Sequence, residues 1–267
     1  MVSSTVPTGA APGRWRTALL GLFALGGFGL SSWASRLPTL REQLGLDNAG
    51  LGLVLAAVTA GALLGLPGGP LLLARLGAPR ALAITSGAGA LGVGLVAAAA
   101  ALGTAPLALV GFAVAGFGIG AMDVLINIDG AMLEQVRGRT LLPLLHAAWP
   151  GGAVLGAGMG AGAAALGIRP EFQLGTQALI MVTATVLLVR WIPVGRRGTG
   201  RERAARLPGR SRRPVLDARL LAIGAVMLAA ELGEGAANNW LSVASRDALG
   251  FSETFAAGLF AVYNGDC

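Results

Sequence analysis

Residues 81–122 read ALAITSGAGALGVGLVAAAAALGTAPLALVGFAVAGFGIGAM, a run of 42 residues without a formal charge. One helix needs only about 20 apolar residues to cross a membrane. The stretch GTAP at 103–106 interrupts the run near its middle, and glycine and proline close together mark turns. The run therefore predicts two membrane-spanning helices joined by a short turn.

Uncharged gaps of membrane-spanning length recur along the chain. There are 19 residues between Arg16 and Arg36, and 27 between Asp47 and Arg75. With the remaining gaps they predict seven spans, at about 15–35, 49–73, 80–102, 106–130, 142–166, 173–192 and 220–243. An eighth span starts near Phe255 with only nine apolar-leaning residues, so we expect it to be truncated. The predicted fold class is an all-α, polytopic membrane helical bundle.

The composition agrees with a membrane protein and excludes several other classes. Hydrophobic residues make up 54% of the chain and charged residues 12%, whereas soluble domains carry about a quarter charged residues. The single cysteine, Cys267, excludes an intrachain disulfide. The segment GAGALG at 87–92 has the spacing of a dinucleotide loop but lies inside an apolar run with no preceding strand. With no metal-spaced cluster either, we expect no metal and no cofactor.

The arginines are unevenly distributed between the two ends of the predicted spans. If the N-terminus is cytoplasmic, 16 of the 20 arginines fall on the inner side and four on the outer side. Cytoplasmic loops of membrane proteins carry an excess of basic residues. We therefore predict a cytoplasmic N-terminus. The absence of lysine, with abundant alanine and glycine, indicates a high-GC bacterial source, so we expect the membrane to be a bacterial inner membrane. The four outer arginines are Arg36, Arg41, Arg169 and Arg246.

A basic segment separates the sixth and seventh spans. Residues 194–219 hold nine arginines against Glu202 and Asp217, so their net charge of +7 equals that of the whole chain. The basic character belongs to one loop and does not indicate nucleic-acid binding. We expect a cytoplasmic linker attracted to anionic lipid head groups near 196–219, with a dedicated partner-binding role as the alternative. The predicted domains are a cytoplasmic tail at 1–13, a six-helix bundle at 14–193, this linker at 194–219, and the start of a second bundle at 220–267.

Three segments resemble one family of transporters. They read SWASRLPTLR at 32–41, MDVLIN at 122–127 and ELGEGA at 231–236. In these segments the chain is similar to the major facilitator superfamily, in a bacterial inner-membrane branch distantly similar to fucose permeases. The resemblance implies two six-helix halves joined by a long cytoplasmic loop, here the first half plus span seven and a truncated span eight. It also implies a transporter that is monomeric when complete, with a central cavity lined by spans one, four, seven and ten.

The best-known motif of this superfamily lies between spans two and three and is only partly present. Arg75, Gly77 and a displaced Arg80 fit the motif, but Ala74 stands where an aspartate is expected. The residues that the family uses for gating at this loop are therefore only partly present.

Polar residues inside the predicted spans are the candidate cavity and proton-coupling groups. A charged side chain within a membrane needs a partner or a water-filled cavity. The candidates are Asp123 and Asn127 on span four, and Glu231, Glu234, Asn238 and Asn239 on span seven. Spacings of three and four residues place side chains on one face of a helix. We expect these groups to bind substrate or protons; alternatively, they only hydrogen-bond to neighbouring helices.

Four further residues each have two interpretations. Arg36 either meets an anionic substrate at the mouth of span one or anchors the span in the membrane. His146 either relays protons or caps and packs the start of span five. Trp33 and Trp240 either belong to the interfacial aromatic belt or stack against a sugar ring.

Asp129 and Glu134 form a separate acidic group towards the cytoplasmic end of span four. With 3.6 residues per turn, Asp129 points about 240° away from Asp123. We therefore expect Asp129 and Glu134 to form ion pairs with Arg137 or Arg139 instead of facing the cavity.

The sequence and the resemblance together predict a secondary active transporter. We expect it to move a small polar solute by alternating access with coupling to protons, since no nucleotide-binding motif supports ATP drive. Two alternatives stay open. One is a non-transporting fragment or pseudogene product of such a transporter, and the other is a membrane-embedded enzyme, for which the sequence offers no nucleophile setting.

Overall fold

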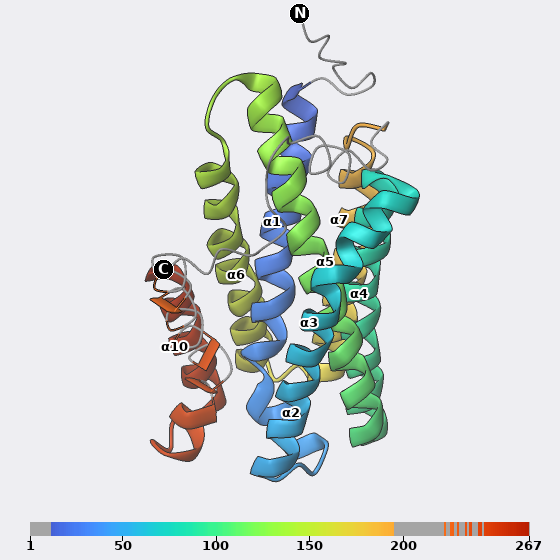
Figure 1. The fold of residues 1–267 in the computed structure, drawn as a ribbon. Helices are drawn as coiled ribbons and strands as arrows, with labels where there is room; N and C mark the ends of the chain where they lie inside the picture. The colour runs from blue at the N-terminus through green and yellow to red at the C-terminus, as the bar shows by residue number, and fades with distance from the viewer. Residues whose placement is uncertain are drawn as a thin grey trace, which may run out of the picture.

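The computed structural model describes residues 12–194 and 243–266 (Figure 1). It also describes the scattered positions 222, 225, 226, 229, 233, 235, 236, 240 and 241. Regular structure in these residues is α-helical, which confirms the all-α prediction. The helices are α1 (Pro12–Ala34), α2 (Leu37–Gln43), α3 (Asn48–Leu76), α4 (Ala78–Leu102), α5 (Ala105–Arg137), α6 (Leu142–Ala165), α7 (Pro170–Val189) and α10 (Glu253–Asp266).

The first six predicted spans each correspond to one long helix, namely α1 and α3 to α7. The uncharged run at 81–122 divides into α4 and α5, with Gly103 at the end of α4. Gly103 has a φ of 64°, a left-handed conformation that glycine adopts without a steric cost. α5 runs beyond its predicted end to Arg137, because the residues after Gly130 include strong helix formers.

The short helix α2 is one that the charge gaps do not predict. It follows α1 after a turn at Ser35 and Arg36, and Pro38 suits its first turn because that position needs no hydrogen-bond donor. Leu37, Pro38 and Leu40 are buried. α2 therefore lies against the end of the bundle, with its charged residues directed outward.

Five described helices are long and apolar enough to cross a membrane, namely α1, α3, α4, α5 and α7. α6, the fifth predicted span, has 24 residues, one more than α1. These helices make the chain a multi-pass membrane protein. The predicted seventh span, 220–243, falls largely outside the described residues. α10 begins at Glu253, close to the predicted start of the eighth span near Phe255.

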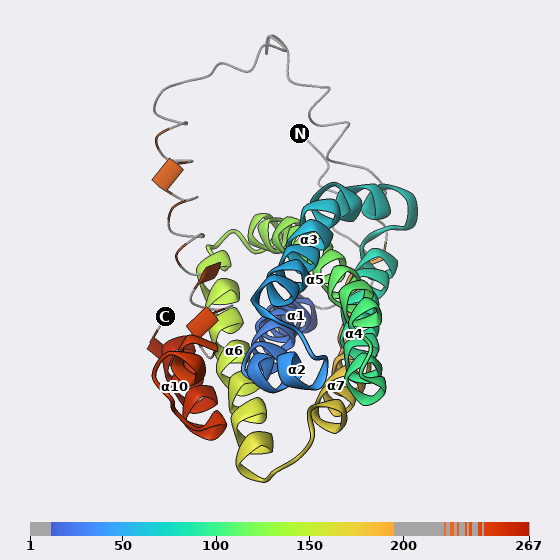
Figure 2. The same ribbon diagram turned by 90° about the horizontal axis from the view of Figure 1, so that it is seen from below.

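α1 lies in the middle of the bundle, as the end-on view in Figure 2 shows, with α6 on one side and α4 and α7 on the other. α3 packs along α5, and α4 packs against both α5 and α7. α10 packs against α6, on the side away from α1 (Figure 2). The buried side of α10 includes Ala256, Ala257 and Phe260.

Glycines allow two pairs of helices to approach at backbone contact. A Cβ atom at Gly152 of α6 would collide with the carbonyl oxygen of Ala24 in α1. A Cβ atom at Gly61 of α3 would collide likewise with the carbonyl oxygen of Ala113 in α5. Small residues at helix contacts are the usual means of close packing in membranes. Glycine therefore determines how closely α1 and α6, and α3 and α5, approach each other.

Trp33 is a core residue and does not belong to an interfacial belt. Its side chain is 2% exposed and meets the ring of Phe112 edge to face, with the centroids 4.9 Å apart. The belt interpretation is wrong for Trp33 because α1 is central, so its side chains face other helices on most sides.

Candidate functional site

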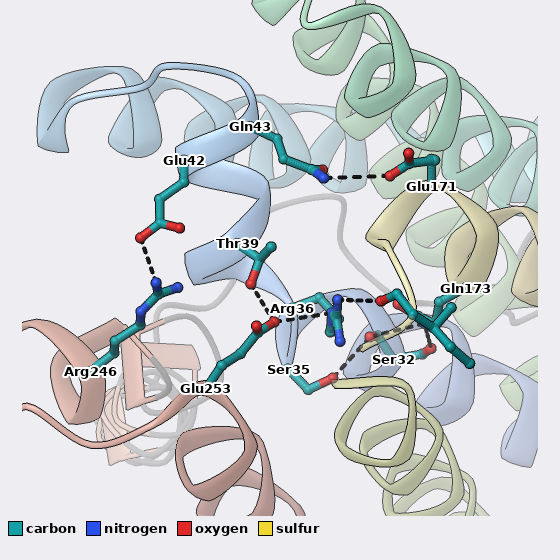
Figure 3. Close-up of polar contacts among 11 residues, drawn as sticks. Ser32, Ser35, Arg36, Thr39, Glu42, Gln43, Glu171, Gln173, Arg246 and Glu253 are labelled. Carbon is teal, nitrogen blue, oxygen red and sulfur yellow. Dashed lines mark hydrogen bonds and ion pairs between the residues drawn. The ribbon is translucent and has the colours of Figure 1, made fainter. Parts of the chain in front are cut away.

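Arg36 is the centre of a polar cluster at the end of the bundle where α2 lies, called the α2 end below (Figure 3). It sits at the turn between α1 and α2 and is 2% exposed. Its Nη2 donates to the carbonyl oxygen of Ile168 at 2.8 Å, and its Nε lies 3.3 Å from Oε1 of Glu253. One buried guanidinium thus joins the α1–α2 turn, the α6–α7 loop and the start of α10.

Two carboxylates from different elements balance the buried charge of Arg36. Burial lowers the pKa of the guanidinium, while Glu253 and Glu171 raise it. An arginine pKa starts far above neutral, so the side chain stays charged. Glu171 lies in the first turn of α7, and Glu253 lies in the first turn of α10. The two countercharges of Arg36 therefore come from two different helices.

Three more ion pairs surround Arg36 at the α2 end. They are Arg41–Asp247, Arg246–Glu42 with 2.6 Å between Nη2 and Oε1, and Arg169–Glu171 with 2.6 Å between Nε and Oε1. The hydroxyl of Thr39 also donates to Glu253 (Figure 3). The four arginines predicted for the outer side therefore all pair with carboxylates at this one end.

A second polar group lies between α1 and α7, and the sequence analysis missed it. Nε2 of Gln173 donates to the Ser32 hydroxyl at 2.7 Å, and Nε2 of Gln177 donates to the carbonyl oxygen of Gly29 at 2.8 Å. Both glutamines are buried. The available signal was two amides four residues apart in an otherwise apolar span, which indicates an interhelical polar contact.

Asp123 and Asn127 interact directly on α5, as their spacing predicts. Nδ2 of Asn127 lies 3.1 Å from Oδ1 of Asp123 and also donates to the Asp123 carbonyl oxygen at 2.9 Å. Both side chains are half-buried. They form a polar position on the surface of the described bundle.

Two hollows among the described helices are too small to hold a solute. One lies beside Trp33 and Phe112, and another lies beside Ser86 and Met122; neither has room for a water molecule. The half-exposed surface at Asp123 is therefore a better candidate for solute contact than the interior of this bundle.

His146 is exposed near the start of α6 and packs against a ring of α1. Its centroid lies 5.1 Å from that of Phe23, in an edge-to-face arrangement. This contact is of the kind that the packing interpretation predicts. Whether His146 also relays protons stays a prediction.

The partial motif between spans two and three forms the connection from α3 to α4. Arg75 lies in the last turn of α3, and Arg80 lies in the first turn of α4. Gly77 joins them with a φ of 81°, and its N–H donates to the carbonyl oxygen of Leu73. The glycine is therefore needed for this turn irrespective of any gating role.

The remaining predicted residues have three different outcomes. Glu134 accepts hydrogen bonds from the backbone N–H groups of Leu141 and Leu142 at 2.6 and 2.8 Å, so it caps the start of α6. Asp129 is buried at 2% exposure, and its pairing with Arg137 or Arg139 stays a prediction. The span-seven candidates Glu231, Glu234, Asn238 and Asn239 lie outside the described residues.

Comparisons with known proteins find transporters that are similar to this chain in sequence or in fold. No protein-family model matches the sequence. The chain is 32% identical over 254 residues to the uncharacterized transporter y4wD of Sinorhizobium fredii, which covers 91% of this chain and 62% of that protein. It is 28% identical over 167 residues to an uncharacterized MFS-type transporter of Yersinia pestis, over 62% of this chain and 41% of the relative. The crystal structure of the nucleoside transporter NupG matches with a TM-score of 0.61 and 18% identity, over 95% of this chain and 64% of NupG.

These relatives show more about the family than about the solute. The chain spans less than two thirds of the length of each, and the likeness to NupG shows the fold alone. The relatives are named as transporters and not as enzymes. Their names do not extend to fucose permeases, so that part of the resemblance stays a prediction. The relatives confirm the predicted resemblance to the major facilitator superfamily, because the Yersinia pestis relative is named as an MFS-type transporter.

Proposed function

We propose that the protein is a secondary active transporter that moves a small polar solute by alternating access and couples this movement to protons. The observation that carries the proposal is the Asp123–Asn127 pair, a polar position on a membrane-spanning helix. A carboxylate inside a membrane is costly when charged, which makes it suited to taking up and releasing a proton. Its half-exposed position leaves it open to a solute that contacts the surface of the bundle.

Substitution of Asp123 tests this proposal. The protein as its gene encodes it is reconstituted in lipid vesicles, and uptake of labelled sugars, nucleosides and amino acids is measured with and without a proton gradient. Asp123→Asn removes the titrating group at nearly constant volume, so we expect gradient-driven uptake to fall at least about 100-fold, the lower end of the effect of one proton-transfer group. The matched control is Asp47→Asn, which removes the same charge but keeps the cap on α3, because asparagine caps as well as aspartate.

Two results count against the proposal. Gradient-driven uptake that is unchanged in Asp123→Asn contradicts the role of this carboxylate. An absence of uptake for every solute, in vesicles that contain correctly inserted protein, contradicts transport itself and favours a chain that does not transport.

The orientation and the lipid contact belong to the same proposal. We place the N-terminus in the cytoplasm of a bacterial inner membrane, which puts the α2 end outside and residues 196–219 inside. The net charge of +7 on residues 194–219 supports an attraction to anionic lipid head groups.

A further inference from the structure

The ion pairs at the α2 end connect two segments from opposite sides of the basic region 194–219. Residues 36–42 belong to the first six-helix bundle, and residues 246–253 lead into α10. Figure 3 shows the connections Arg36–Glu253, Glu42–Arg246 and Thr39–Glu253. A fourth connection is Arg41–Asp247. α10 also packs against α6 through an apolar surface. The first bundle thus holds α10 by a polar contact at one end and an apolar contact along its side.

The two kinds of contact respond differently to movement of α10. The apolar contact includes the small residues Ala256 and Ala257, and apolar contacts have no directional bonds to lose when one helix rolls on another. The pairs at the α2 end are partly exposed, with the Glu42 side chain 61% and the Asp247 side chain 48% accessible. Exposed ion pairs contribute little net stability, so they separate easily. The contact with α6 therefore suits a pivot, and the α2 end suits a contact that opens and closes.

The order of charges at the α2 end favours a single closed position. Arg41 and Glu42 are neighbours of opposite sign, and they meet Asp247 and Arg246, which are also neighbours of opposite sign. A shift of one residue between these two segments would bring like charges together. Like-charge contacts are unfavourable, so the closed position is defined even though each pair is weak.

Arg36 is arranged so that it can lose one partner without becoming an isolated buried charge. Glu253 would leave with α10, but Glu171 and the Ile168 carbonyl oxygen belong to the first bundle and would remain. Burying an unpaired charge is strongly unfavourable. Glu171 thus lowers the cost of breaking the contact between Arg36 and Glu253.

We propose that these residues form a latch that holds the α2 end closed in this structure and releases when α10 pivots on α6. The latch comprises Arg36, Thr39, Arg41 and Glu42 on the first bundle, and Arg246, Asp247 and Glu253 on the other segment. It rests on the proposed alternating-access function and assigns to named residues the closure of one side of the transport path. Release of the latch opens the α2 end to solute.

The first test measures access to a residue beneath the latch, independently of transport. Ser35 is 1% exposed and adjacent to Arg36, so Ser35→Cys in a Cys267→Ser background serves as the probe. Its rate of reaction with a membrane-impermeant maleimide is measured in membranes open on both sides. Arg41→Asp should raise the rate about fivefold, as expected for loss of one exposed pair. The double change Arg41→Asp with Asp247→Arg restores opposite charges and should return the rate to its starting value.

The matched control is Arg169→Asp, which makes the same change of charge in a pair with Glu171 that stays within the first bundle. It should leave the maleimide rate unchanged. The latch is overturned if Arg41→Asp labels no faster than the parent, or if Arg169→Asp labels as fast as Arg41→Asp.

The second test locks the latch. Cysteines at Glu42 and Arg246 are joined by a short bifunctional reagent, and intact mass spectrometry checks that the reagent is added once. The cross-linked protein should lose uptake. A cysteine pair at Phe251 and Phe255, whose exposed rings meet within the segment that holds α10, should cross-link without loss of uptake. Full uptake by the protein locked between positions 42 and 246 contradicts the latch.

The two tests separate failure of the latch from failure of the proposed function. If no solute is transported, the function fails, but the maleimide rates still decide whether the α2 end opens through these ion pairs. If solute is transported and the rates do not respond, the latch alone fails.

Discussion

Arg36 shows how much a single side chain contributes to the α2 end. It is nearly inaccessible, yet it contacts a carbonyl oxygen 132 residues away and a carboxylate on α10. Asp123 and Asn127 differ, because their interaction is local to one turn of helix. The first kind of contact joins distant parts of the chain, and the second joins two side chains of one helix.

Replacement of Arg36 should destabilise the folded protein. Arg36→Gln removes the ion pair with Glu253 and weakens the bond to Ile168, and we expect a loss of about 2 kcal/mol. This value lies below that of a fully buried pair because the Glu253 side chain is 28% exposed. The measurement is the thermal unfolding midpoint in detergent. Arg36→Lys keeps the charge and should lose less, so equal losses in the two variants would contradict the importance of the charge.

The sequence predicts local polar contacts better than distant ones. The spacing of Asp123 and Asn127 was sufficient to place them together, because helix geometry fixes neighbours four residues apart. The partners of Arg36 could not be predicted in this way, since Glu253 is more than 200 residues away and charge alone does not select a partner. Gln173 and Gln177 carried a usable signal, two amides on one face of an apolar span.

At the scale of helices, glycine decides which elements lie in direct contact. The first six spans follow from gaps between charges, because a membrane helix excludes charge over a fixed length. The sequence does not say which helix fills the close contact at each glycine, so the pairing of α1 with α6 emerges only from the structure. α2 was missed because a seven-residue amphipathic helix leaves no uncharged gap.

Two neighbouring glycines of α6 should respond oppositely to a methyl group. Gly152→Ala would force α6 away from Ala24 of α1, and we expect a loss of about 1–3 kcal/mol from overpacking. Gly151→Ala meets nothing within 4 Å and should be neutral or slightly stabilising, because alanine is the better helix former. Thermal unfolding of both variants in detergent measures the difference. Equal midpoints would show that α1 and α6 do not approach as closely as described.

At the scale of the whole molecule, positive charge is distributed unevenly along the chain. The α2 end has its arginines matched by carboxylates, whereas residues 194–219 carry a net charge of +7. The balanced charges of the α2 end give it no strong attraction to anionic lipid. The net positive charge of residues 194–219 favours the side of the membrane with anionic head groups. This asymmetry underlies the proposed orientation.

Two exposed threonines in opposite loops test that orientation. Thr104 lies between α4 and α5, and Thr140 lies between α5 and α6. In a Cys267→Ser background, an impermeant maleimide added to intact cells should label Thr104→Cys at once and Thr140→Cys only after lysis. The reverse pattern would place the α2 end in the cytoplasm.

The contacts between α1 and α7 also have a consequence for how the protein is made. Ser32 and Gln173 are 141 residues apart, and at a synthesis rate of about 5–20 residues per second the glutamine follows on the order of ten seconds later. During that interval Ser32 on the nascent α1 and Arg36 in the following turn lack the partners that they have in the finished protein. The insertion machinery must therefore shelter the first helix until the sixth span emerges from the ribosome.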